Sequence, residues 1–391
     1  MAKDNITRYL INNLLNRDFV FCFLAFFIFA AAIHALTPTI PIYLARSGSG
    51  EREIGVLVGI FGISSLISRF IVGACLRKCS EKSVMMAGAI IFALGSFAFI
   101  FLRPFWPFFA VRIMQGVAFA CLDTAALAFI VNVIPGAYRG QTLAYFMLAP
   151  NLALTVAPVF GMFLINRYSF TFFFLTVMAL ALGAFALSRL LKGRKTDKSE
   201  ERTAVSRNRF FEGRIVAPAA IGFMHTFTFG AIVAFFPLYA IQRGVNNPGL
   251  FFSAVAVMII AGRILGGRML DAWSKDRIIL TFLAVGLAAM IILSFSETLS
   301  MFIIVGILWG TCTSILAPAT MTYAFEYAGS SDGTAVGTFR SLTDSGAALG
   351  PMIMGILIPV TGYRGMFLCL AFICFIDLGY FQFYVRRHRP M

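Results

Sequence analysis

Long runs of apolar residues, interrupted by short polar breaks, follow one another along almost the whole sequence. About twelve of these runs are long enough to cross a bilayer as helices. The chain is 60% hydrophobic, more than one soluble core can bury. We therefore predict an all-α integral membrane protein. The predicted spans are 19–44, 53–76, 83–102, 106–133, 141–165, 169–191, 215–241, 249–271, 277–296, 300–327, 333–359 and 364–385.

The sequence also contains an internal duplication. Residues 68–84 recur in altered form at residues 262–278, at an offset of about 194 residues. A second echo, from the stretch after Asn151 to the stretch after Asp344, follows at nearly the same offset. Secondary transporters built from parallel repeats place their substrate site between the halves. We expect two six-helix halves related by pseudo-two-fold symmetry, with function at their junction. The expected division is an N-terminal bundle (1–191), a linker (192–214) and a C-terminal bundle (215–391).

The basic residues predict the orientation of the chain. Lys and Arg concentrate near both termini and between residues 189 and 214, whereas the alternate loops hold only scattered ones. An even number of spans puts both termini on one side, and the positive-inside rule makes that side the cytoplasm. Residues 192–214 are polar and mixed in charge, which is typical of a solvated linker. The net charge of +15 therefore follows the topology and does not indicate a nucleic-acid partner.

No motif indicates an enzyme, a cofactor or a metal site. Most of the seven cysteines lie inside predicted spans, where they act as small apolar residues. Cys75 and Cys79 share a helical face, but a structural zinc site needs four ligands. The phosphate-binding pattern GxxxxGK[ST] is absent, and no nucleophile stands with a base and an orienting group. We expect a non-enzymatic protein without cofactors.

A short charged loop follows the second span and its repeat. The repeat reads Gly267 and Asp271 followed by the basic Arg277, whereas the first copy has Gly73 and places Arg77 where the acid would stand. This pattern resembles the Gly-x-x-x-Asp signature of the major facilitator superfamily. In that family the loops latch neighbouring helices on the cytoplasmic side. The resemblance implies that these five residues form a cytoplasmic gate.

Two more motifs strengthen the resemblance. The fourth span reads FFAVRIMQGVAFA, which is similar to the family's intramembrane motif of an Arg before Gln-Gly. The segments APVFG (157–161) and GAALGPMIMG (346–355) resemble the Gly-Pro-x-x-Gly element of its antiporters. The resemblance implies the major facilitator fold and a drug or metabolite antiporter coupled to protons. The implied helix-packing residues are Pro158, Gly161, Gly346, Gly350, Pro351 and Gly355.

Ionisable side chains at bilayer depth are costly, so those that face the bundle interior are functional candidates. Arg112 and Asp123 are eleven residues apart and return to nearly the same helical face. Asp123 is either a proton acceptor or one half of a fixed tie to a basic residue such as Arg69. Arg112 either attracts an anionic group or tunes protonation. Both alternatives stay open at this point.

Other candidates lie in or between the repeats. Arg340 and Asp344 have the i, i+4 spacing of an ion pair, yet Asp344 also occupies the repeat position of Asn151. His34 and His225 lie on the first and seventh spans, where a histidine either carries a proton or is a satisfied core residue. The candidate proton-coupling residues are Asp123, Asp344, Arg112, His34 and His225. The candidate substrate contacts are Arg112, Gln115, Asn151, His34, His225 and Asp344.

A structural role is expected for Asp377, which we interpret as neutralising Arg340 across two adjacent spans. Two functions remain for the whole chain. The first is a monomeric proton-coupled antiporter of the inner membrane that exports a small amphipathic compound or metabolite by alternating access. The alternative is a proton-coupled importer of a small organic anion held by Arg112. The expected partners are a small-molecule substrate, protons and the lipid bilayer.

Overall fold

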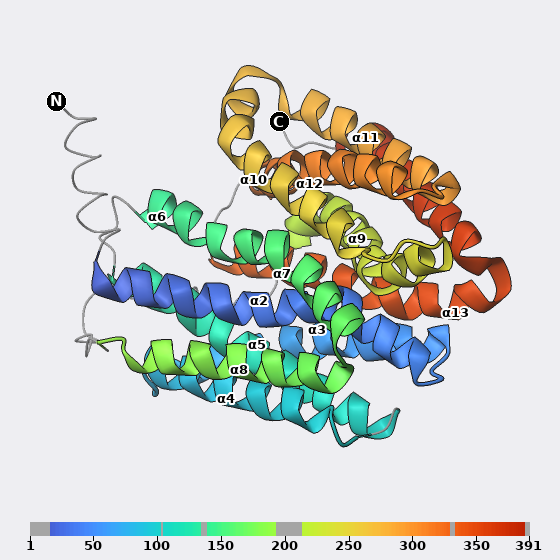
Figure 1. Ribbon diagram of the computed structural model, residues 1–391. Helices are drawn as coiled ribbons and strands as arrows, with labels where there is room; N and C mark the ends of the chain where they lie inside the picture. Colours follow the sequence, from blue (N-terminus) through green and yellow to red (C-terminus); the bar gives the residue numbers. More distant parts are fainter. Residues whose placement is uncertain (1–15, 103–104, 134–138, 193–212, 329–332, 388–391) are drawn as a thin grey trace. The chain divides into compact units, whose positions relative to one another are not determined.

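The computed structural model describes residues 16–102, 105–133, 139–192, 213–328 and 333–387 (Figure 1). Within these ranges the chain consists of helices and short connections, and no β-strand occurs. The prediction of an all-α protein is therefore confirmed. Helices suit a bilayer because each one satisfies its own backbone hydrogen bonds. The side chains of residues 139–141, 144, 263–272 and 333 lie outside the description.

Ten helices among the described residues are long and apolar enough to cross a membrane. Gly249–Gly262 is a further apolar helix of shorter length. The last candidate, Thr334–Val385, is too long for one crossing, which takes about 20 residues. It is interrupted at Gly362, whose φ of 69° lies in the left-handed region that favours glycine. From the sequence we expect two membrane spans here. The total of twelve spans stays a prediction.

The chain divides into two compact units. The first unit combines Met1–Leu36 with Ser64–Lys198, and the second combines Thr37–Ile63 with Ser199–Met391. The boundary therefore also passes through the first two long helices. The division expected at the polar linker 192–214 stays a prediction.

In the first unit, three helices pack side by side, with α4 in contact with both α5 and α8 (Figure 1). Serine caps mark where two of them begin. The Ser80 hydroxyl accepts a hydrogen bond from the Ser83 N–H, and the Ser169 hydroxyl accepts one from the Phe172 N–H, both at 3.2 Å. The helices are α2 (Arg17–Arg46, to Leu36), α3 (Glu51–Cys75, from Ser64), α4 (Glu81–Ala98), α5 (Trp106–Val133), α6 (Arg139–Phe146), α7 (Leu148–Arg167) and α8 (Phe170–Arg189).

The predicted span 141–165 is divided in the structure. Helix α6 ends at Phe146 and α7 begins at Leu148. The cause is Pro150, because a proline has no N–H and its ring clashes with the carbonyl group four residues earlier, here Phe146. In α7 Pro150 occupies the first turn, where no intrahelical N–H bond is needed.

In the second unit, α9 and α13 share the most extensive contact, and α12 packs on both α10 and α11. Figure 1 shows the second unit's helices α10, α11 and α12 in yellow and orange. The elements are η2 (Gly213–Ile215), α9 (Val216–Gln242), α10 (Gly249–Ala272), α11 (Lys275–Phe295), α12 (Leu299–Ala328), α13 (Gly333–Tyr380) and η3 (Phe381–Val385), together with the Thr37–Ile63 part of α2 and α3.

Glycines allow α9 and α13 to approach closely. A Cβ atom added at Gly346 would collide with the Phe223 carbonyl oxygen, and one added at Gly350 would collide with that of Phe227. In the same way Gly355 faces the carbonyl oxygen of Glu51 in α3. Small residues at such contacts are typical of helices that pack in membranes. The segment GAALGPMIMG thus lies where helices meet within the second unit.

Candidate functional site

A buried polar network joins α5 to α4 in the first unit. The Arg112 guanidinium, 8% exposed, donates from Nη1 to the Gln115 side-chain oxygen at 3.0 Å. The Gln115 amide in turn lies 3.4 Å from the Ser96 hydroxyl, which donates to the Phe92 carbonyl oxygen at 2.8 Å. Arg112 and Gln115 meet because residues three apart share a helical face. The network therefore holds a cation inside an apolar helix bundle.

Asp123 lies on the same helix and is paired with a cation from α3. Its Oδ2 atom is 3.2 Å from Nη2 of Arg69, and the two side chains are 13% and 24% exposed. The Arg69 guanidinium also faces the ring of Phe119, with 5.6 Å to the ring centroid. Of the two interpretations left open by the sequence, the tie to Arg69 is formed in this structure. The ion pair with Arg69 is compatible with proton binding at another stage. A proton on the Asp123 carboxylate would remove its negative charge and break the ion pair.

His34 and Asn151 belong to the first unit but stand apart from the Arg112 network in their contacts. His34 is half-buried in α2, and none of its described neighbours forms a hydrogen bond with it. Asn151 is buried, and its amide donates to the Met147 carbonyl oxygen of its own chain segment at 2.6 Å. The Asn151 side-chain amide therefore bonds within its own segment in this conformation.

His225 forms the polar centre of the second unit. Its Nε2 atom lies 3.1 Å from the Thr313 hydroxyl of α12, and its ring stacks on Trp309 at 4.8 Å between centroids. Trp309 is fully buried, and its indole N–H finds no acceptor among the described residues. A buried donor without an acceptor is costly, so an unmatched one marks a place where a water or ligand oxygen is expected.

The charged residues of α13 do not form the contacts expected from spacing. Arg340 is exposed and Asp344 half-buried, and these two described side chains form no ion pair with each other. Asp377 is 2% exposed and has no basic partner within the described chain. The interpretation of Asp377 as the neutraliser of Arg340 is therefore wrong. The reason is that Arg340 is exposed, whereas Asp377 is buried inside the second unit.

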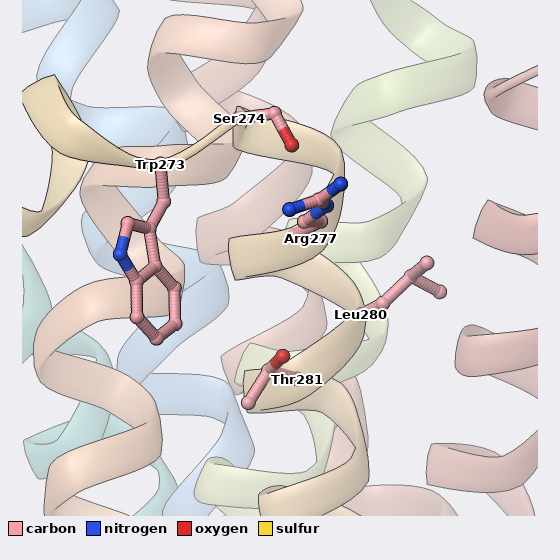
Figure 2. Close-up of a pocket in the computed structure, with 5 residues that line it drawn as sticks. All are labelled: Trp273, Ser274, Arg277, Leu280 and Thr281. Atoms are coloured by element: carbon pink, nitrogen blue, oxygen red, sulfur yellow. The ribbon is translucent and has the colours of Figure 1, made fainter.

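The residues expected at the cytoplasmic gate are mostly exposed or outside the described side chains. Gly73 and Arg77 are exposed, and the side chains of Gly267 and Asp271 lie outside the description. Arg277 stands in the first turn of α11, beside a pocket of about 600 Å³. Figure 2 shows the pocket's lining at the start of this helix: Trp273, Ser274, Arg277, Leu280 and Thr281.

Ion pairs secure the same end of α11. Lys275 pairs with Glu326 of α12, and Asp276 lies 3.6 Å from Nε of Arg386, just after η3. The Trp273 side chain beside them is 55% exposed. An open pocket with exposed walls suits a helix-end contact better than the enclosed binding of a transported molecule. The buried polar groups are therefore better candidates for the substrate site than this pocket.

Another expected helix contact lies in the first unit. Pro158 and Gly161 are buried in α7, and a Cβ atom added at Gly161 would lie 2.8 Å from the Ala35 carbonyl oxygen of α2. In the second unit, Pro351 is buried, and its carbonyl oxygen lies where a Cβ atom at Gly55 would collide with it. Both antiporter-like segments thus lie at close helix contacts.

Sequence reasoning missed several neutral partners in these networks. Ser96, Trp309 and Thr313 carry no motif and no charge, so nothing separated them from other core residues. The i, i+4 spacing of Trp309 and Thr313, which puts both on one face of a helix, was the available signal. Their partners follow from tertiary packing alone.

A sequence profile described as the Major Facilitator Superfamily matches residues 22–329 and 247–391. The chain belongs to this superfamily. The resemblance inferred from the three motifs is therefore confirmed. The superfamily consists of transporters that act on small molecules as single-chain membrane proteins. The protein is accordingly a multi-pass membrane transporter and not an enzyme.

Its relatives extend over nearly the whole chain. The staphylopine export protein of Staphylococcus aureus (strain Mu50 / ATCC 700699) is 22% identical over 87% of this chain and 89% of its own length. Multidrug resistance protein 1 of Bacillus subtilis (strain 168) is 25% identical, with 92% of each chain covered. A bacterial homologue of the human lysosomal transporter Spinster, solved in an inward-facing and unoccupied conformation, superposes with a TM-score of 0.75 at 12% identity. That match covers 98% of this chain and 99% of the homologue, and it supports the fold alone.

Proposed function

We propose that this superfamily member exports a small amphipathic compound or metabolite in exchange for protons. The names of its relatives support export, since one is an export protein and the other a multidrug resistance protein. The proposal includes location in the inner membrane, with both termini in the cytoplasm, and action as a monomer. It also keeps transport by alternating access, which is expected of a chain with two repeated halves.

The observation that carries proton coupling is the ion pair between Asp123 and Arg69. Both groups lie in an apolar unit, where opposite charges attract strongly. A proton on Asp123 would neutralise the carboxylate and remove its attraction to Arg69. The contact between α5 and α3 then has two states, one for each protonation state. A group of this kind can bias a transporter between conformations, because a ligand shifts an equilibrium only through differential interaction.

The other candidate residues supply the substrate contacts in this proposal. Arg112 and Gln115 offer hydrogen bonds in the first unit, and His225 beside Trp309 offers them in the second. An amphipathic molecule bound in either unit would place its polar atoms on the groups of that unit and its apolar part on the surrounding aromatic side chains. His34, Asn151 and Asp344 remain proposed contacts of other conformations, since alternating access exposes different faces of the helices.

The decisive experiment is transport driven by a pH gradient in proteoliposomes, with ethidium as the probe. The lumen is made acidic, so that protons leaving it can drive the dye inward. We expect accumulation by wild-type protein and loss of the gradient-driven part in Asp123→Asn. Glu297→Gln is the matched control, because Glu297 is an exposed carboxylate paired with Arg243 at 2.8 Å. Accumulation by Asp123→Asn equal to that of wild type would contradict the assignment of Asp123.

One observation favours the alternative, import of a small organic anion. Arg112 is a buried cation, and its Nη1 atom donates to the Gln115 side-chain oxygen at 3.0 Å. A guanidinium has five N–H donors, so a substrate carboxylate could accept charge-assisted hydrogen bonds from it. Uptake of a radiolabelled carboxylate that is lost in Arg112→Gln and retained in Asp123→Asn would favour this function over drug export.

A further inference from the structure

Asp377 is a buried carboxyl group that the proposed function does not use. It lies in the part of α13 that follows the break at Gly362 and is 2% exposed. Its Oδ1 atom is fully buried and has no hydrogen-bond partner, and no cation pairs with it in the part of the chain that the structure describes. An ionised carboxylate in such a place would be expensive, whereas a protonated one is neutral. The geometry therefore favours a bound proton.

The surroundings of Asp377 are polar but uncharged. Cys374 lies one helical turn earlier on the same face of α13, and α12 contributes Cys312, whose thiol donates to the Phe282 carbonyl oxygen of α11 at 3.0 Å. The groups that titrate around Asp377 are these two thiols and the Tyr380 hydroxyl of its own helix. All three are neutral near pH 7 when unperturbed. None of them offers a positive charge to hold a carboxylate.

Helix α9 connects this group to the polar centre of the second unit. The Thr228 hydroxyl lies 3.9 Å from the Cys374 sulfur, and His225 stands three residues earlier on the same face of α9. His225 in turn contacts Thr313 of α12. Asp377, Cys374, Thr228 and His225 thus lie on facing parts of α13 and α9 within the second unit. The Thr228 hydroxyl donates to the Met224 carbonyl oxygen of its own helix at 3.0 Å, so it offers no hydrogen bond to the Asp377 Oδ1 atom.

We propose that Asp377 is a neutral carboxylic acid in this conformation and is the proton-binding group of the second unit. On release, in a conformation that admits water to this place, the proton passes from the carboxyl oxygen to a water molecule and a carboxylate remains. The inference rests on the proposed function in one respect, namely that transport is coupled to protons. It assigns to the second unit a coupling group of its own, separate from Asp123 in the first.

Infrared spectroscopy tests the protonation state without any substrate. Purified protein at pH 7 in dodecyl maltoside, a detergent without carbonyl groups, is expected to show the carbonyl stretching band of a protonated carboxylic acid. Asp377→Asn should remove that band, because an amide absorbs elsewhere, and Glu297→Gln should leave it unchanged. A band that survives Asp377→Asn at full strength would overturn the proposal. The measurement also needs no transport activity, so it stands even if the proposed function fails.

Transport separates a coupling role from a structural one. Asn has nearly the shape of Asp, so Asp377→Asn should still exchange ethidium across the membrane without a pH gradient. Its gradient-driven accumulation should fall by about tenfold or more. Equal loss of exchange and accumulation would assign Asp377 to structure and overturn the proposal, as would full retention of both. Wild-type protein that ignores the pH gradient would contradict the proposed function instead, and the infrared band would then decide the state of Asp377.

Discussion

At the scale of single residues, charges dominate because the medium around them is apolar. A side-chain charge in a helix bundle needs a partner, and its behaviour depends on which partner the fold provides. Asp123 has Arg69, whereas Asp377 is paired with no cation in the described part of the chain. Two carboxyl groups of the same residue type are thereby expected in opposite protonation states. This contrast lets one protein hold a charged tie and a neutral acid at once.

The tie predicts a non-additive mutant cycle. Arg69→Gln and Asp123→Asn each remove one side of the Arg69–Asp123 ion pair, and each should lower the stability by about 1–3 kcal/mol, the range reduced for partial exposure. The double variant loses the same ion pair only once and should be more stable than the sum of the two losses predicts. Thermal unfolding of the purified proteins in detergent measures all four. Strictly additive losses would contradict a direct pairing of these side chains.

Part of the candidate site could be predicted from the sequence. The spacing of Arg112 and Gln115 places them on one helical face, and the structure shows a hydrogen bond between them. The pair Arg69–Asp123 was one of two open alternatives, because helical periodicity shows which residues share a face and not which neighbouring helix they meet. The isolation of Asp377 was missed for the same reason. Whether Arg340 points inward or outward depends on how α13 packs, and periodicity in an all-apolar helix carries little of that information.

At the scale of elements, the positions of glycines decide how closely the helices pack. Gly346 and Gly350 bring α13 against backbone atoms of α9, where a side chain would not fit. The run lengths of the sequence anticipated most helices well, and α5 (Trp106–Val133) has the predicted bounds. The break at Pro150 was not anticipated. Hydropathy alone predicts one continuous span around Pro150, although the missing N–H of this proline divides α6 from α7.

Two glycine substitutions on α13 should therefore have opposite effects. Gly350→Ala would place a Cβ atom against the Phe227 carbonyl group and within 3.2 Å of the Ala231 nitrogen. We expect a loss of about 1–3 kcal/mol from overpacking. Gly379→Ala meets no atom within 4 Å and should instead gain up to about 1 kcal/mol of helix propensity.

Thermal unfolding of both glycine variants beside wild type is the measurement. A melting temperature for Gly350→Ala at or above that of Gly379→Ala would show that close approach of α9 and α13 does not stabilise the second unit. Because both changes are Gly to Ala on one helix, differences in the unfolded chain largely cancel.

At the scale of the whole molecule, the sequence established the class of protein, and the structure and the family match agree with it. Apolar run lengths determine a helical membrane protein because the bilayer sets the span length. The motifs then identified the superfamily, which the profile match confirms. The sequence does not identify the substrate. A pocket for an amphipathic molecule is made of ordinary apolar side chains, so composition does not distinguish the pocket from the core.

In the proposed function, substrate and protons move in opposite directions through this chain. The direct measurement uses proteoliposomes that contain a pH-sensitive dye, with no imposed pH gradient and with ethidium added outside. Entry of the probe should raise the luminal pH as protons leave, and protein-free vesicles should show no such rise. Ethidium entry that leaves the luminal pH unchanged, or that lowers it, would contradict proton-coupled exchange.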